Sequence, residues 1–256
     1  MPAAPVATLA RLGPRPAPAR RLVCFPYAGG GVAVYGQWWR ALPDDVEVIG
    51  VQLPGREARL SEAPLDSIDG MAGAALPAVA ALGDLPFAFF GHSMGALIAF
   101  ELTLALEAAG GAAPERLFVS SRRAPDERDT HLPVHTLPDA AFLDAIQARF
   151  AAIPDAVRNE PELLELVLPT LRADIRAVET YAPERGRRVY CPVRAYGGAS
   201  DTHPRPSQLA GWQRAALQPL SVRTFDGDHF YLTPQRTPLL ADLVAHWPRT
   251  TGAGCR

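Results

Sequence analysis

A serine in a glycine-flanked motif is the clearest candidate nucleophile in this sequence. Residues 91–95 read GHSMG, which places Ser93 between a predicted strand at 87–90 and a predicted helix from residue 96. A strand that turns directly into a helix needs glycine on both sides of the serine, and it exposes the serine at a helix N-terminus. Because a serine hydroxyl reacts only when a base oriented by an acid removes its proton, the motif predicts a catalytic triad around Ser93.

The base is to be chosen among the histidines that follow Ser93, because the chain order in this setting is nucleophile, acid, base. The candidates are His131, His135, His203, His229 and His246. His131 and His135 lie in a predicted insertion, and His246 lies in a predicted C-terminal helix. His203 is disfavoured because it stands close in sequence to the acid candidate Asp201. His229 follows the last predicted strand, where a loop returns over the sheet edge, so we predict His229 as the base.

The predicted acid is Asp201, which follows a predicted strand at 193–197. Asp226 and Asp228 are closer to His229 in sequence, but neighbours on one turn rarely face each other, and we expect them to shape that turn. The other position where an acid can stand, after the strand that follows the nucleophile helix, reads SSRR at 120–123 and has no carboxylate.

A developing oxyanion needs two backbone N–H donors. We expect one from Met94, directly after the nucleophile, and one from Ala28 in the loop FPYAGGG at 25–31, with Tyr27 and Gly29 as alternatives to Ala28. A phosphate-binding function of these glycines is disfavoured, because neither dinucleotide-binding nor P-loop spacing is present.

The elements that must position these residues alternate between strands and helices. Apolar runs predict strands at 21–25, 47–51, 87–90, 116–120, 193–197 and 221–225, and helices at 68–82, 96–109, 206–216 and 237–247. This alternation predicts an α/β fold, with a mostly parallel central sheet covered by helices on both faces.

The alternation is interrupted from about residue 122 to 188, where only helices are predicted, at 139–150 and 160–181. A block of this length exceeds an ordinary connection, so we expect it to be a helical lid inserted into a single domain spanning 21–250. Residues 1–20 contain five prolines and are expected to form a flexible tail.

Composition excludes several functional classes. The chain has 256 residues, and all its 25 basic residues are arginines. Its net charge is -2, so no overall positive electrostatic potential that would attract nucleic acid is expected. Three scattered cysteines and the unpaired histidine spacing predict neither a disulfide framework nor a metal site. No apolar run approaches a membrane span, and no signal-peptide core is present, so a cytoplasmic protein is expected.

Seven segments stand in order from about residue 21 to 247: FPYAGGG at 25–31, QLPGRE at 52–57 with Arg59, FGHSMG at 90–95, SRRAP at 121–125, LPTLRAD at 168–174, ETY at 179–181 and GDHF at 227–230. Taken together, these segments resemble the type II thioesterases, free-standing α/β-hydrolases that accompany polyketide and non-ribosomal peptide synthases.

The resemblance implies an α/β-hydrolase fold and hydrolysis of acyl thioesters carried on the phosphopantetheine of acyl or peptidyl carrier proteins. It implies an editing role that removes aberrant or stalled acyl groups, no cofactor, and a monomer. It also carries over the triad Ser93, Asp201 and His229 and the oxyanion amides of Ala28 and Met94. The alternatives are a generic serine esterase, an acyltransferase, and a non-catalytic carrier-binding protein on the same fold.

Overall fold

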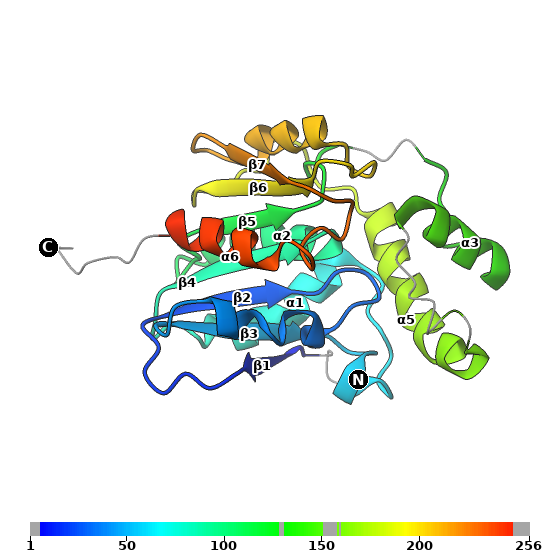
Figure 1. Ribbon diagram of the computed structural model, residues 1–256, viewed down its shortest axis with the longest axis horizontal. Helices are drawn as coiled ribbons and strands as arrows, with labels where there is room; N and C mark the ends of the chain where they lie inside the picture. The colour runs from blue at the N-terminus through cyan, green and yellow to red at the C-terminus, as the bar shows by residue number, and fades with distance from the viewer. Residues whose placement is uncertain (1–5, 128–130, 151–157, 159, 248–256) are drawn as a thin grey trace, which may run out of the picture.

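A seven-stranded sheet forms the centre of the protein. The computed structural model describes residues 6–127, 131–150, 158 and 160–247. The strands are β1 (Thr8–Leu12), β2 (Arg20–Phe25), β3 (Val46–Gln52), β4 (Phe87–His92), β5 (Leu117–Ser120), β6 (Val193–Gly198) and β7 (Ser221–Phe225). Their order is β1-β3-β2-β4-β5-β6-β7, and all neighbours are parallel except β1, which pairs antiparallel with β3. The predicted α/β architecture is confirmed (Figure 1).

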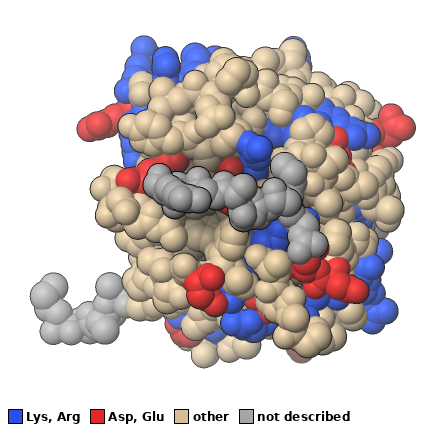
Figure 2. Space-filling model, turned by 90° about the vertical axis from the view of Figure 1, so that its left-hand side faces the viewer, with Lys and Arg blue, Asp and Glu red and all other residues tan. Residues whose placement is uncertain are grey.

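Helices cover both faces of the sheet. Helices α1 (Ile68–Ala80) and α2 (Met94–Ala108) lie behind it in Figure 1, and α6 (Arg236–Ala245) lies in front. The predicted helix at 206–216 is a 3-10 helix at Pro206–Ala215. Between β5 and β6 the chain forms α3 (Asp139–Phe150) and α5 (Pro161–Thr180), which lie together beyond the carboxyl ends of the strands (Figure 1). The opposite end of the molecule shows basic and acidic side chains interspersed (Figure 2).

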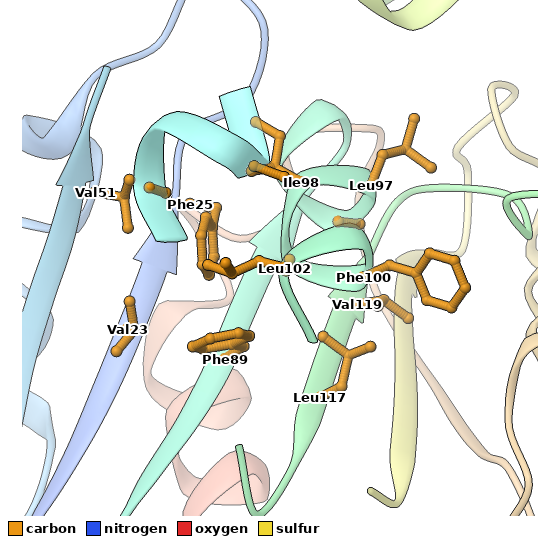
Figure 3. Packing of buried hydrophobic residues seen from close by; sticks show 14 of the residues in the cluster. Val23, Phe25, Val51, Phe89, Leu97, Ile98, Phe100, Leu102, Leu117 and Val119 are labelled. Atoms are coloured by element: carbon orange, nitrogen blue, oxygen red, sulfur yellow. The ribbon is translucent and has the colours of Figure 1, made fainter. Parts of the chain in front are cut away.

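The buried residues form two large apolar layers, because side chains along each strand alternate between the two faces of the sheet. Val23 and Phe25 of β2 belong to the layer beneath α1 and α2, which Figure 3 shows at close range. Leu22 and Cys24 of the same strand belong to the layer on the other face, beneath α6. This burial on both faces explains why the central strands read as continuous apolar runs in the sequence.

The prediction that residues 1–20 form a flexible tail is wrong for the described part of that segment. Strand β1 pairs with β3 along its whole length, from Thr8 opposite Gln52 to Leu12 opposite Val48. Arg15 donates hydrogen bonds to the carbonyl oxygens of Val46 and Leu42, which fixes the chain after the strand. Residues 1–5 lie outside the described residues. The strand was not predicted because it is only five residues long and prolines stand before and after it. Such a short strand is typical of the edge of a sheet, where β1 lies.

Candidate active site

Ser93 stands at a strained turn between β4 and α2. Its backbone angles, φ 52° and ψ -115°, lie in a region that non-glycine residues rarely adopt, at a cost of about 1–3 kcal/mol. A Cβ atom on Gly91 would lie 2.2 Å from the carbonyl oxygen of Gly95, and one on Gly95 would lie 2.4 Å from that of Phe25. Both glycines of the motif are therefore sterically required, and the turn holds Ser93 at the carboxyl edge of the sheet.

Asp201 and His229 come together from the loops that follow β6 and β7. The Nδ1 atom of His229 lies 3.0 Å from Oδ2 of Asp201, and both side chains are buried. The two loops are tied by a hydrogen bond from the Ser200 N–H to the Gly227 carbonyl oxygen. With Nδ1 donating to the carboxylate, Nε2 of His229 is left as a proton acceptor.

Ser93 and His229 line the same pocket, together with Ala28. The structure thus brings the three predicted triad residues to one site, with Asp201 behind the imidazole. The carboxylate of Asp228 accepts a hydrogen bond from the Phe230 N–H on its own turn, as expected for a turn-forming residue.

The alternative histidines have other contacts. Nδ1 of His135 lies 2.6 Å from Glu179, and His246 contacts the carbonyl oxygen of Asp242 at the end of α6. The two Nε2 atoms of His131 and His203 lie 3.2 Å apart. His203 borders a second pocket that Ser93 also lines, and its N–H donates to Oδ1 of Asp201, so it lies beside the acid rather than in place of the base.

The loop after β2 forms a tight turn at the same pocket. The Gly30 N–H donates to the Tyr27 carbonyl oxygen at 2.9 Å, and Gly29 has φ +74°, a combination that defines a type II turn. The Gly29 N–H is already bonded to Oδ2 of Asp174 at 2.8 Å. Within the described residues the N–H of Ala28 donates no hydrogen bond, so this amide, rather than that of Gly29, is the available donor. Met94 begins α2, where backbone N–H groups lack helical partners.

A second histidine, His92, lies behind the candidate triad and was missed by sequence reasoning. Its ring centroid is 5.1 Å from that of His229, and its Nδ1 contacts Ser120 Oγ, which in turn contacts the Tyr231 hydroxyl at 2.7 Å. Complete burial, and then the nearby charge of His229, lower the pKa of His92 well below its ordinary 6.5. His92 is therefore a neutral packing group against the base, and its place inside the GHSMG motif was the one signal for it.

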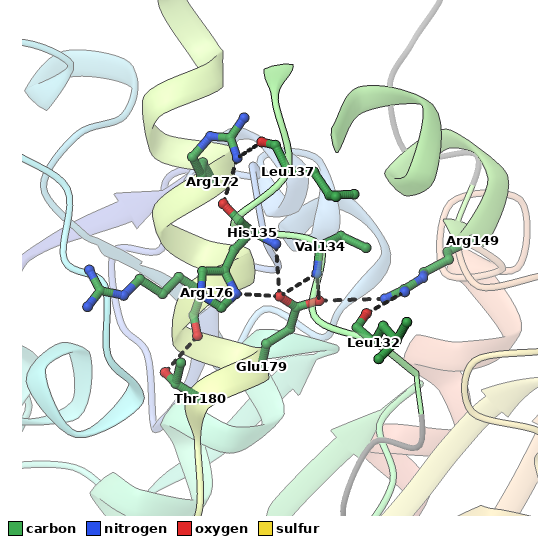
Figure 4. Close-up of polar contacts among 9 residues, drawn as sticks. All are labelled: Leu132, Val134, His135, Leu137, Arg149, Arg172, Arg176, Glu179 and Thr180. Carbon is green, nitrogen blue, oxygen red and sulfur yellow. Dashed lines mark hydrogen bonds and ion pairs between the residues drawn. The ribbon is translucent and has the colours of Figure 1, made fainter. Parts of the chain in front are cut away.

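Helix α5 contacts the loop at residues 131–138, which precedes α3 (Figure 4). The carboxylate of Glu179 on α5 accepts hydrogen bonds from the N–H groups of Val134 and His135. Arg149 of α3 approaches the same carboxylate at 3.6 Å, and Arg172 of α5 donates to the His135 carbonyl oxygen. The Glu179 carboxylate of α5 thus gathers contacts from α3 and from the loop that precedes α3.

The inner faces of these helices wall the pocket of Ser93 with apolar side chains. Ile146 and Phe150 come from α3, and Leu171, Ile175 and Val178 come from α5. The Phe150 ring centroid lies 5.0 Å from that of His229. A larger cavity of about 490 Å³ adjoins this pocket, and Arg122 and Val178 border both.

The mostly parallel sheet, the strained serine turn and the buried Asp201–His229 pair define an α/β-hydrolase. The sequence profile described as Thioesterase domain matches residues 20–247, so the chain belongs to the thioesterase family. Among its relatives, thioesterase PikA5 of Streptomyces venezuelae is 39% identical over 244 residues, which are 95% of this chain and 86% of that protein. The gramicidin S biosynthesis protein GrsT of Aneurinibacillus migulanus is 36% identical over 83% of this chain and 82% of that protein.

Solved structures give the same result. The type II thioesterase BorB from the borrelidin biosynthetic cluster superposes with a TM-score of 0.85 at 35% identity, over 94% of this chain and 98% of that one. These similarities in sequence and structure place the chain among the type II thioesterases.

The described residues contain no group of three or more His, Cys, Asp or Glu side chains arranged to hold a metal. Within the same residues, no helix is both long and apolar enough to cross a membrane.

Proposed function

We propose that this thioesterase hydrolyses acyl thioesters on the phosphopantetheine arm of acyl or peptidyl carrier proteins, and so removes aberrant or stalled acyl groups. The observation that carries the proposal is the arrangement of Ser93 and the buried His229–Asp201 pair at one pocket, in a chain of the thioesterase family. The names of the relatives support a role in biosynthesis, since PikA5 is called a thioesterase and GrsT a gramicidin S biosynthesis protein.

The chemistry proceeds through an acyl-enzyme. Ser93 Oγ attacks the thioester carbonyl carbon while Nε2 of His229 takes the hydroxyl proton, and the N–H groups of Ala28 and Met94 bind the oxyanion. The carbon–sulfur bond breaks, and His229 returns its proton to the departing thiolate, which is a good leaving group because thiols have pKa values of about 8.5. A water that loses its proton to His229 then cleaves the acyl-serine ester. Asp201 holds the imidazole orientation and stabilises its cation.

This sequence of steps uses only side chains and backbone amides, so we propose that the enzyme needs no cofactor. The partner is a carrier protein, and the acyl chain enters the apolar pocket walled by α3 and α5, which act as a lid. We further propose a monomer that works in the cytoplasm beside its synthase, without nucleic acid or membrane.

The test compares leaving groups. A panel of acyl groups from acetyl to medium chain is loaded on a carrier protein, and hydrolysis is compared with that of the same acyl groups as oxygen esters, with Ser93→Ala as control. The proposal predicts release from the carrier that the variant abolishes, while the variant still binds the carrier. Rapid cleavage of oxygen esters without carrier activity indicates a generic esterase, and acyl transfer to an acceptor other than water indicates an acyltransferase.

A further inference from the structure

A buried ion pair lies directly beneath the turn that presents Ala28. Arg56, from the loop after β3, donates two hydrogen bonds to the carboxylate of Asp174 on α5, from Nη2 to Oδ1 at 2.8 Å and from Nη1 to Oδ2 at 3.0 Å. Asp174 is completely buried, and Arg56 is 4% exposed. A bidentate arginine–carboxylate pair with this burial fixes the relative position of the two elements that supply it.

Both members of the pair also hold the backbone of the turn. Oδ2 of Asp174 accepts the Gly29 N–H at 2.8 Å, and Nη1 of Arg56 donates to the Gly30 carbonyl oxygen at 3.0 Å. The peptide between Ala28 and Gly29 is the central peptide of the type II turn, and its rotation sets the direction of the neighbouring amides. The ion pair therefore holds two backbone groups of the turn that carries Ala28, and Ala28 lines the pocket of Ser93.

The same stretch of α5 also contacts both the turn and the loop that carries Arg56. Thr170 Oγ1 donates a hydrogen bond to the Gly55 carbonyl oxygen, and a Cβ atom placed on Gly29 would lie 3.0 Å from Cδ1 of Leu171. Leu171 and the next turns of α5 wall the pocket of Ser93. One helix thus touches both the acyl pocket and the turn.

We propose that Asp174 and Arg56 are positioning residues that tie the Ala28 turn to α5, so that the Ala28 N–H is aligned for the oxyanion only while α5 is seated. This inference rests on the proposed function and on the assignment of Ala28 to the oxyanion site. Burial raises the pKa of Asp174, and the charge and hydrogen bonds of Arg56, together with the Gly29 N–H, oppose that rise. Removing either partner leaves the other buried without its counter-charge.

The test uses Asp174→Asn and Arg56→Lys. Asp174→Asn keeps the side-chain shape but removes the charge, and Arg56→Lys keeps the charge but removes the forked donor. The matched control is Asp66→Asn, which removes the exposed ion pair between Asp66 and Arg176 on the same helix. We expect kcat on an acyl-pantetheine to fall about 100-fold or more in both test variants, as for loss of an oxyanion donor, with KM within about threefold and the control unchanged.

A second measurement separates positioning from a general structural effect. A trifluoromethyl ketone analogue of the acyl thioester becomes a tetrahedral oxyanion on Ser93, whereas the matching thioether has no electrophilic carbonyl. We expect the test variants to weaken binding of the ketone about as much as kcat falls and to leave thioether binding nearly unchanged. Equal weakening of both ligands, or an unchanged kcat in folded Arg56→Lys, overturns the inference. If the wild-type protein hydrolyses no thioester, the proposed function fails instead, so the two failures are distinct.

Discussion

Gly95→Ala should separate the two halves of the oxyanion site. Gly95 lies one residue after Met94, at the start of α2, where the helix passes the end of β2. The added Cβ atom would lie 2.4 Å from the Phe25 carbonyl oxygen and 2.9 Å from that of Pro26. Ordinary van der Waals contact begins near 3.4 Å, so α2 and the start of the Ala28 loop must move apart by about 1 Å.

The displacement acts on catalysis more than on folding. Overpacking of this size costs about 1–3 kcal/mol of stability, which a domain of ordinary stability survives. A shift of about 1 Å between the amides of Met94 and Ala28 disturbs the geometry that holds the oxyanion, and a misplacement of that size costs about 100-fold in rate. We therefore expect kcat to fall about 100-fold in a protein that is still folded.

The matched control is Gly73→Ala, another glycine-to-alanine change inside a helix. A Cβ atom on Gly73 of α1 meets no heavy atom within 4 Å. This variant should keep wild-type kcat and gain about 0.5–1 kcal/mol of stability. The assay is steady-state hydrolysis of an acyl-pantetheine, with thermal unfolding of each protein. A folded Gly95→Ala variant within threefold of wild-type kcat would refute the steric reasoning.

Three further predictions test a buried histidine, a helix cap and a wall of the pocket. The pKa of His92 is lowered in the fold, so below pH 6.5 the unfolded chain takes up a proton at this residue and the native protein does not. The free energy of unfolding of the wild type should therefore fall as the pH drops below 6.5. Urea unfolding should show it falling by up to about 1.4 kcal/mol per pH unit more than that of His92→Asn. Ser67 caps α1 by accepting the Gly70 N–H, so Ser67→Ala should cost about 1 kcal/mol in the same measurement and leave kcat unchanged. Phe150 packs against His229 and narrows the pocket, so Phe150→Ala should raise the rate on medium-chain relative to acetyl thioesters, and an unchanged chain-length profile would contradict its place as a wall.

Much of the fold was predictable because its signals are local. The apolar runs of the central strands reflect burial on both faces, and the strands Ser221–Phe225 and Leu117–Ser120 were found at or within one residue of their observed bounds. The candidate triad followed from one motif and from the rule that side chains after parallel strands meet at one edge of the sheet.

Features that depend on distant partners were not predictable. Strand β1 is short and alternates weakly, so only its pairing with β3 reveals it. Arg56 stands in the segment QLPGRE at 52–57, but its partner Asp174 lies 118 residues away, and no spacing rule connects the two. The preference for Ala28 over Gly29 as the available donor likewise depends on that carboxylate, which the sequence places only in a helix.

The most direct test of the account is to identify the acylated residue. The wild-type enzyme is mixed with an acyl-loaded carrier protein and quenched in acid during turnover, and its peptides are analysed by mass spectrometry. The account predicts the acyl mass on the peptide that contains Ser93, its absence in Ser93→Ala, and little or no acyl mass in His229→Gln, since acylation also needs the base. Continued turnover by Ser93→Ala, or an acyl group on another residue, would contradict the central claim.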